Sequence, residues 1–207
     1  MEEMCAGIKA VNIEEQKQEF LTELRKVKRD GIEGLINYLE SSDFFTAPSS
    51  KMCHGSFDGG LCAHSLAVLK RLRSLYKEYL TVATKNIIKE FDEESLIVCA
   101  LLHDLCKVNT YHKYLKNIKN ETTGQWEQEE AYKIDELLYM GHSAKSLFII
   151  ERYIKLDLEE YQAIYFHMGG WGMNQSDMVN VGNAYAQNPL AVLLHLADME
   201  ATYLDRC

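Results

Sequence analysis

The chain has little of what secreted, disordered or membrane-spanning proteins require. Only two of its 207 residues are proline and there is no low-complexity tract, so we expect disorder to be confined to the termini. No apolar run reaches the length of a transmembrane helix, and the first residues lack the pattern of a secretory signal peptide. These absences predict a cytoplasmic protein without a membrane partner.

Positive charge is scarce as well. The chain has 22 Lys and Arg against 31 Asp and Glu, which gives a net charge of −9. Proteins that bind nucleic acid through their general surface usually carry a basic excess. Long nucleic acid is therefore disfavoured as a partner, although a local metal site could still attract a phosphate.

Cysteine pairs with metal-binding spacing are missing too. The six cysteines form no CxxC pair and match no zinc motif. Cys99 and Cys106 lie seven residues apart, so we expect them on one helix face as small buried core residues. Without plausible thiolate ligands, a structural zinc site is disfavoured.

Apolar residues recur at helical spacing through most of the chain and predict an all-α domain with one small β-hairpin. A hairpin is indicated near residues 111–134 by alternating residues around a polar turn at 120–124. Residues 1–49 are expected to form helices that pack on the core, and residues 50–207 to form the main domain. The expected helices span residues 13–28, 32–39, 61–80, 92–107, 141–153, 158–167, 182–187 and 189–201.

The most apolar run, LIVCALLHDLCK at residues 96–107, ends in two adjacent polar residues, His103 and Asp104. An imidazole beside a carboxylate is costly in a core unless both have partners, and a bound metal suits both. Further polar residues stand on apolar helices elsewhere in the chain. They are His64, His142, His167, His195 and Asp198.

A single histidine on an apolar face is usually a hydrogen-bonded core residue. Six or seven such side chains on separate helices would each need a buried partner of their own, whereas one metal centre satisfies them jointly. Imidazole and carboxylate ligands suit divalent Mn, Fe, Co, Ni or Zn, with Mg as a further candidate.

The order H…HD…H…H…D resembles the HD-domain superfamily of metal-dependent phosphohydrolases. The motifs are GGLCAHSL, LLHDLCK, MGHSAKS, YFHMGGWG and LLHLADME. The first two are similar to the HD part of bacterial 3′–5′ exoribonucleases. The hairpin and HMGGWG resemble small uncharacterised HD proteins of Firmicutes and their phages. The resemblance covers roughly residues 50–205 and implies an HD-domain helical bundle.

The resemblance also implies a ligand set. One metal would be held by His64, His103, Asp104 and Asp198, and Asp104 would bridge to a second metal held by His142 and His167. No side-chain nucleophile is evident, so a metal-bound hydroxide is expected to attack the phosphorus of a small nucleotide-type phosphate ester.

Three more residues are candidates for the substrate. Lys107, expected on the same helical face as Asp104, would contact the phosphate and stabilise developing charge, or merely pair with Asp104. His54 would contact the phosphate or protonate the leaving group, or is an ordinary loop histidine. Trp171 would stack on a base at the rim, or packs on the domain. We expect His195 to hold a ligand or a backbone carbonyl rather than a metal.

Two other functions remain open from the sequence. Diiron oxygenases of the inositol-oxygenase type use the same ligand order, and a non-catalytic metal- or nucleotide-binding module is the third alternative. Degenerate HD domains usually lose ligands and all six are present, which disfavours the non-catalytic module. The ligands alone do not exclude the oxygenase, and the phosphohydrolase is the leading expectation. The hairpin is expected to act as a substrate lid or an oligomer contact, and the sequence does not choose between them.

Overall fold

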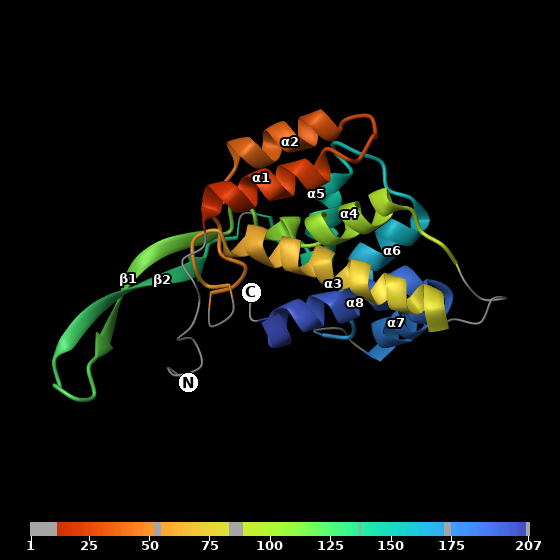
Figure 1. The fold of residues 1–207 in the computed structure, drawn as a ribbon. Coiled ribbons are helices and arrows are strands. Elements are labelled where there is room, and N and C mark those ends of the chain that lie inside the picture. Colours follow the sequence, from red (N-terminus) through yellow and green to blue (C-terminus); the bar gives the residue numbers. More distant parts are fainter. Residues whose placement is uncertain (1–11, 52–54, 83–88, 137, 172–174, 206–207) are drawn as a thin grey trace.

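The structure, a computed structural model, describes residues 12–51, 55–82, 89–136, 138–171 and 175–205. The described residues form a helical body from which one antiparallel hairpin projects (Figure 1), so the expected helical domain with a small β-hairpin is confirmed. The helices are α1 (Ile13–Leu24), α2 (Ile32–Ser41), α3 (Gly60–Val82), α4 (Glu93–Leu102), α5 (His142–Ile150), α6 (Leu158–Phe166), α7 (Gln175–Gln187) and α8 (Pro189–Glu200).

Side-chain caps begin several of these helices where the sequence predicts. The Asn12 carboxamide oxygen accepts the N–H of Glu15 at 3.3 Å, and the Asp92 carboxylate accepts the N–H of Ser95 at 2.7 Å. Pro189 stands in the first turn of α8, where its missing N–H costs nothing. The first turns of α1, α4 and α8 are therefore specified locally.

Helix α4 is the centre of the core. All its residues from Ser95 to Leu102 are buried, as expected for a helix that is apolar on every side. It packs against α1, α3 and α6, while α8 packs against α3 and α6. In Figure 1, α1 and α2 lie above α3, and α8 lies below it. The buried apolar side chains of these helices, and of α2 and α5, form one continuous cluster.

A buried ion pair fixes α6 against the N-terminal helices. The Arg29 guanidinium, in the turn before α2, donates two hydrogen bonds to Glu160, at 2.6 and 2.5 Å. Glu160 is fully buried and also accepts the N–H of Asp157, which caps α6. Helix α6 is thus held at its first turn, and its far end carries His167.

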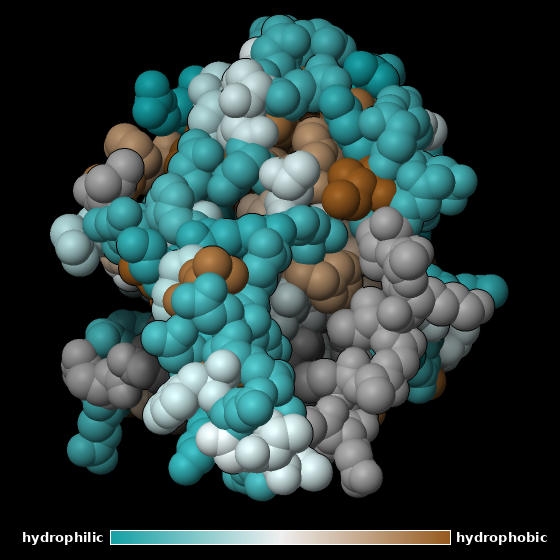
Figure 2. All heavy atoms as spheres, turned by 90° about the vertical axis from the view of Figure 1, so that its left-hand side faces the viewer, coloured by the Kyte–Doolittle hydropathy of each residue, from teal (hydrophilic) through white to brown (hydrophobic). Residues whose placement is uncertain are grey.

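The hairpin consists of β1 (Tyr111–Lys119) and β2 (Trp126–Ile134), with Tyr111 opposite Ile134. An isolated two-stranded hairpin is marginally stable, so its attachments matter. Asp58 accepts hydrogen bonds from Lys113 at 2.7 Å and from the Tyr132 hydroxyl at 2.6 Å. Figure 2, seen from the hairpin side, shows mostly hydrophilic surface with a few apolar side chains.

A second attachment holds the base of the hairpin on both strands. The buried ammonium group of Lys145 on α5 donates to the Thr110 hydroxyl at 2.9 Å and to Glu136 at 2.8 Å. Thr110 precedes β1 and Glu136 follows β2. The base of the hairpin is therefore fixed to the helix that begins with His142.

Several expected helix bounds are wrong. The helices expected over 13–28 and 141–153 end at Leu24 and Ile150. The short turn predicted at 182–187 belongs to the longer α7, in which Val181 and Ala184 are buried and most of the rest faces solvent, so the apolar stripe is narrow. The helix predicted to continue to residue 107 ends at Leu102. None of the described helices combines the length and the apolar character needed to span a bilayer.

Candidate metal centre

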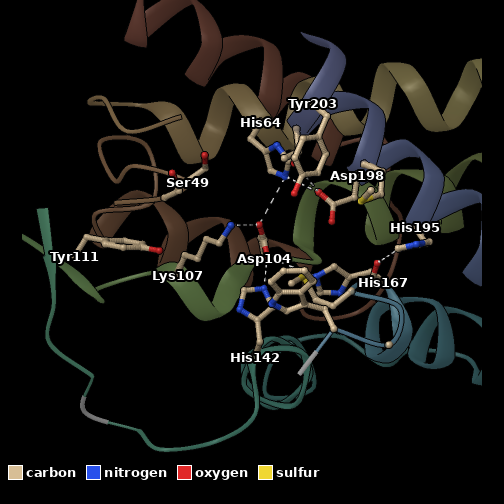
Figure 3. Close-up of a pocket in the computed structure, with 16 residues that line it drawn as sticks. Ser49, His64, Asp104, Lys107, Tyr111, His142, His167, His195, Asp198 and Tyr203 are labelled. Carbon is tan, nitrogen blue, oxygen red and sulfur yellow. Dashed lines mark hydrogen bonds and ion pairs between the residues drawn. The ribbon is translucent and has the colours of Figure 1, made fainter. Parts of the chain in front are cut away.

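Five helices deliver the predicted ligands to one place. The first turns of α3 present His64, the end of α4 presents His103 and Asp104, and α5 begins with His142. His167 follows the last residue of α6, and Asp198 lies on α8. All six side chains lie around one point in the body, five of them labelled in Figure 3. Their roles as metal ligands remain predictions.

The end of α4 gives the site its shape. Asp104 leaves the helix at φ −105° and ψ 20°, and a tighter 3-10 turn, Leu105–Lys107, follows. Asn109 then adopts a left-handed φ of 53°, and its N–H donates to the Asp43 carboxylate at 2.7 Å. In a 3-10 turn, side chains three residues apart eclipse each other, which brings Lys107 onto Asp104.

Asp104 is the central residue, because its two oxygens face different histidines. Oδ2 lies 3.5 Å from His103 Nε2 and 3.7 Å from His64 Nε2. Oδ1 lies 2.6 Å from His142 Nε2 and 3.7 Å from His167 Nε2. This division is the arrangement that a carboxylate bridging two metals requires.

Asp198 belongs with the first of these pairs. Its Oδ1 lies 3.0 Å from His64 Nε2 and 3.9 Å from His103 Nε2. Ligand atoms of His64, His103 and Asp198 all lie within 4.8 Å of one another. The three residues could therefore share one ion with Asp104.

The buried Nε2 atoms of His103 and His167 show whether the site suits a metal ion. The Nδ1 atoms of His103 and His167 bind the carbonyl oxygens of Ala100 at 2.9 Å and Ile164 at 2.6 Å. A carbonyl only accepts, so each Nδ1 carries a proton, and in the neutral imidazole each Nε2 presents a lone pair. Both Nε2 atoms are buried without a hydrogen-bond partner. Buried nitrogens oriented in this way are typical of metal-binding histidines, and the donor set fits divalent ions.

The charges at the site favour a cation. Burial alone would raise the pKa of Asp104, but Lys107, His103 and His142 lower it well below its usual range. Burial lowers the pKa of His142, and the Asp104 carboxylate outweighs this and raises it to about 10. The pKa of Asp198 is lowered against the effect of burial, chiefly by His64. The carboxylates stay ionised and collect positive charge, which a divalent ion supplies when it displaces protons.

His195 holds the end of α6, as the sequence predicts. Its Nδ1 donates to the carbonyl oxygen of His167 at 2.6 Å, so it binds the backbone of a predicted ligand. Gly169 lies against the same ring with a φ of +60°, and a Cβ there would come within 2.9 Å of His195 Cε1. Glycine is therefore required for this close approach.

The cluster opens into a cavity of about 520 Å³. Lys107 lines it beside Asp104, and Tyr111, at the first position of β1, lines it next to Lys107. Trp171 is 80% exposed and lines the same cavity, so it lies at the rim and does not pack on the domain. His54 lies outside the described residues.

Sequence reasoning missed three residues at this site. Tyr111, which the sequence places only in the hairpin, and Tyr203, for which the sequence carries no signal, both line the cavity. Cys106 is buried, as the sequence predicts, and in addition its Sγ lies 3.2 Å from His142 Nδ1. Its position two residues after Asp104 was the available signal for Cys106.

Comparison with known proteins agrees with this geometry. A family model described as the HD domain matches residues 61–202, more than half of the chain. Neither the curated proteins nor the solved structures yielded a match. HD domains are generally found in metal-dependent phosphohydrolases. The matched residues include all six predicted ligands, and the chain belongs to the HD-domain family.

Proposed function

We propose that the protein is a metal-dependent phosphohydrolase that cleaves a phosphate ester of a small nucleotide-type molecule at a dinuclear centre. The observation that carries this proposal is the division of the two Asp104 oxygens between two histidine pairs at the wall of a cavity. A ligand set for a single ion would not need histidines on both oxygens of the same carboxylate.

The two pairs define two metal positions. His64, His103, Asp104 and Asp198 would hold one ion, and Asp104 with His142 and His167 would hold the other. The donor atoms suit Mn, Fe, Co, Ni or Zn. When bound, such ions supply Lewis-acid charge for a phosphate and lower the pKa of a coordinated water.

Lys107 would bind the phosphate. Its Nζ lies 2.5 Å from Asp104 Oδ2 and its side chain lines the cavity. The pKa of Lys107 is raised, because Asp104 outweighs the opposing effect of burial, so the group stays charged. A phosphate beside Asp104 would therefore receive both a hydrogen bond and a positive charge from this residue.

The cavity supports a small substrate. Its volume of about 520 Å³ lies within the range typical of small-molecule sites. Trp171 and Tyr203, both largely exposed at the cavity, offer aromatic faces on which a base would stack. The net charge of −9 opposes binding of a long polyanion. Protonation of the leaving group by His54 remains a prediction from the sequence.

The test is hydrolysis by protein that has been stripped of metal and reloaded with Mn or Co. We expect turnover of bis(p-nitrophenyl) phosphate or of a member of a nucleotide panel, without uptake of oxygen. Asp104→Ala should lose metal and turnover, whereas Asp30→Ala, at an exposed position, should keep both. Full metal occupancy without turnover of any phosphate would contradict the proposal. Iron-dependent oxygen uptake would instead identify an oxygenase.

A further inference from the structure

Cys106 differs from the other cysteines that the structure describes. The sulfurs of Cys62 and Cys99 lie in the apolar core and donate to the backbone carbonyl oxygens of Gln16 and Glu160. The Cys106 sulfur instead lies 3.2 Å from Nδ1 and 3.5 Å from Nε2 of His142, a predicted metal ligand. The thiol therefore faces the metal centre and not the core alone.

Three donor atoms of different kinds meet at this point. Ligand atoms of Asp104, Cys106 and His142 all lie within 4.8 Å of one another. Zinc-type ions bind nitrogen and sulfur at about 2.0–2.3 Å, so their ligand atoms lie about 3–4 Å apart. Cys106 Sγ lies 3.5 Å from His142 Nε2, within this range. His142 Nε2 and Asp104 Oδ1 lie closer, at 2.6 Å, so these two atoms would move apart slightly to hold one ion.

A buried, unsatisfied nitrogen points to the same place. His167 Nε2 has no hydrogen-bond partner and faces Asp104 Oδ1, the oxygen that His142 also contacts. The local fold fixes the sulfur as well, because the N–H of Cys106 donates to the Ser146 hydroxyl on α5 at 3.0 Å. The 3-10 turn and α5 are thus joined next to the ligands that they carry.

We infer that Cys106 is a ligand of the metal held by His142, which makes this position a mixed oxygen, nitrogen and sulfur site. The sulfur binds as a thiolate, and its proton leaves to solvent when the ion enters. The inference rests on the metal centre of the proposed function but not on the hydrolysis of any ester.

A sulfur ligand narrows the class of metal. Thiolates select borderline and soft ions, whereas carboxylate and water ligands suit Mg and Mn. The position at His142 should therefore prefer Zn, Co or Fe(II) over Mg and Mn. The position at His64 and Asp198 has only nitrogen and oxygen donors among the described residues and should be less selective.

The test uses cobalt, whose visible bands report occupancy and whose near-ultraviolet sulfur-to-metal band reports a thiolate ligand. Metal-free protein is titrated with Co²⁺ until both positions are filled. We expect the sulfur band in the wild type and in Cys99→Ser, a matched variant at a fully buried cysteine, and its loss in Cys106→Ser. The occupied site at His64 should keep its visible bands in all three proteins.

Two results would overturn the inference. One is full cobalt occupancy of the wild type without the sulfur band, and the other is a band that persists in Cys106→Ser. If Cys106→Ser does not fold, the same titration is done with Cys106→Ala. X-ray absorption at the cobalt edge of the wild type then tests directly whether a sulfur atom is bound to cobalt. A sulfur band in protein that hydrolyses no phosphate would leave Cys106 as a ligand and reject only the proposed function.

Discussion

Lys107 Nζ lies 2.5 Å from Asp104 Oδ2, the oxygen that also faces His64 and His103. Lys107→Met keeps most of the side-chain volume and removes the charge. If the lysine stabilises the charge that develops on a phosphate, kcat/KM for a phosphodiester should fall by about 10²–10³. Metal content, measured by elemental analysis, should stay unchanged because Lys107 donates no lone pair.

The matched control for this variant is Lys116→Met, on the exposed part of β1, which should retain full activity. Loss of metal together with activity in Lys107→Met would show that the lysine only supports Asp104. Metal content therefore distinguishes a lysine that acts on the phosphate from one that only supports Asp104, whatever the size of the activity loss.

The two oxygens of Asp104 serve two different histidine pairs, so substitutions should divide the metals in a specific way. Asp104→Asn removes the shared charge and should lose both ions. His64→Gln and His142→Gln should each lose one ion, because each histidine faces a different oxygen. Metal-to-protein ratios after dialysis would show this pattern, with His112→Gln on the exposed face of β1 as the control. Retention of both ions by His142→Gln would contradict the second position.

Metal binding should stabilise the fold, because the buried Nε2 atoms of His103 and His167 have no partner without an ion. At free metal one hundred times above its Kd, each bound ion adds about 2.7 kcal/mol. For a chain of this size that corresponds to a rise in Tm of roughly 5–10 °C. Thermal unfolding of metal-free and Co-loaded protein measures the shift. An unchanged Tm in protein shown to contain metal would mean that these histidines are not ligands.

The starts of the helices and the gathering of the polar side chains were predictable from the sequence, and local chemistry specifies the helix starts. Asn12 and Asp92 cap helices through hydrogen bonds three residues away, which depend on no other part of the chain. The polar residues among apolar helices pointed to one site, because no common alternative satisfies so many of them together. Alternation of residues likewise indicated the hairpin.

The end of α4 and the contact of Cys106 with His142 were not predicted from the sequence, because both depend on residues that are distant in the chain. The turn after Lys107 is held by Asp43, which is 66 residues from Asn109 in the chain. The contact between Cys106 and His142 joins residues that are 36 apart. The sequence has no periodicity that reports such pairs, and a strongly apolar run predicts a longer helix than the tertiary contacts permit.

The attachment of the hairpin to Asp58 should depend on pH in a predictable direction. Burial raises the pKa of Asp58, but the hydrogen bonds from Lys113 and Tyr132 outweigh it and lower the pKa. A carboxyl group whose pKa is lower in the folded state stabilises the fold above its unfolded pKa of about 4, and this contribution disappears as the pH falls through the folded value. Because the pair is half exposed, we expect it to add only about 0.5–1 kcal/mol to the free energy of unfolding.

Urea unfolding of the wild type and Asp58→Asn should therefore differ by this amount at neutral pH and converge in acid. Tyr132→Phe, which leaves the Lys113 ion pair in place, should keep part of the pH dependence; a gap between wild type and Asp58→Asn that stays constant with pH would mean that the ionised carboxylate does not hold the hairpin.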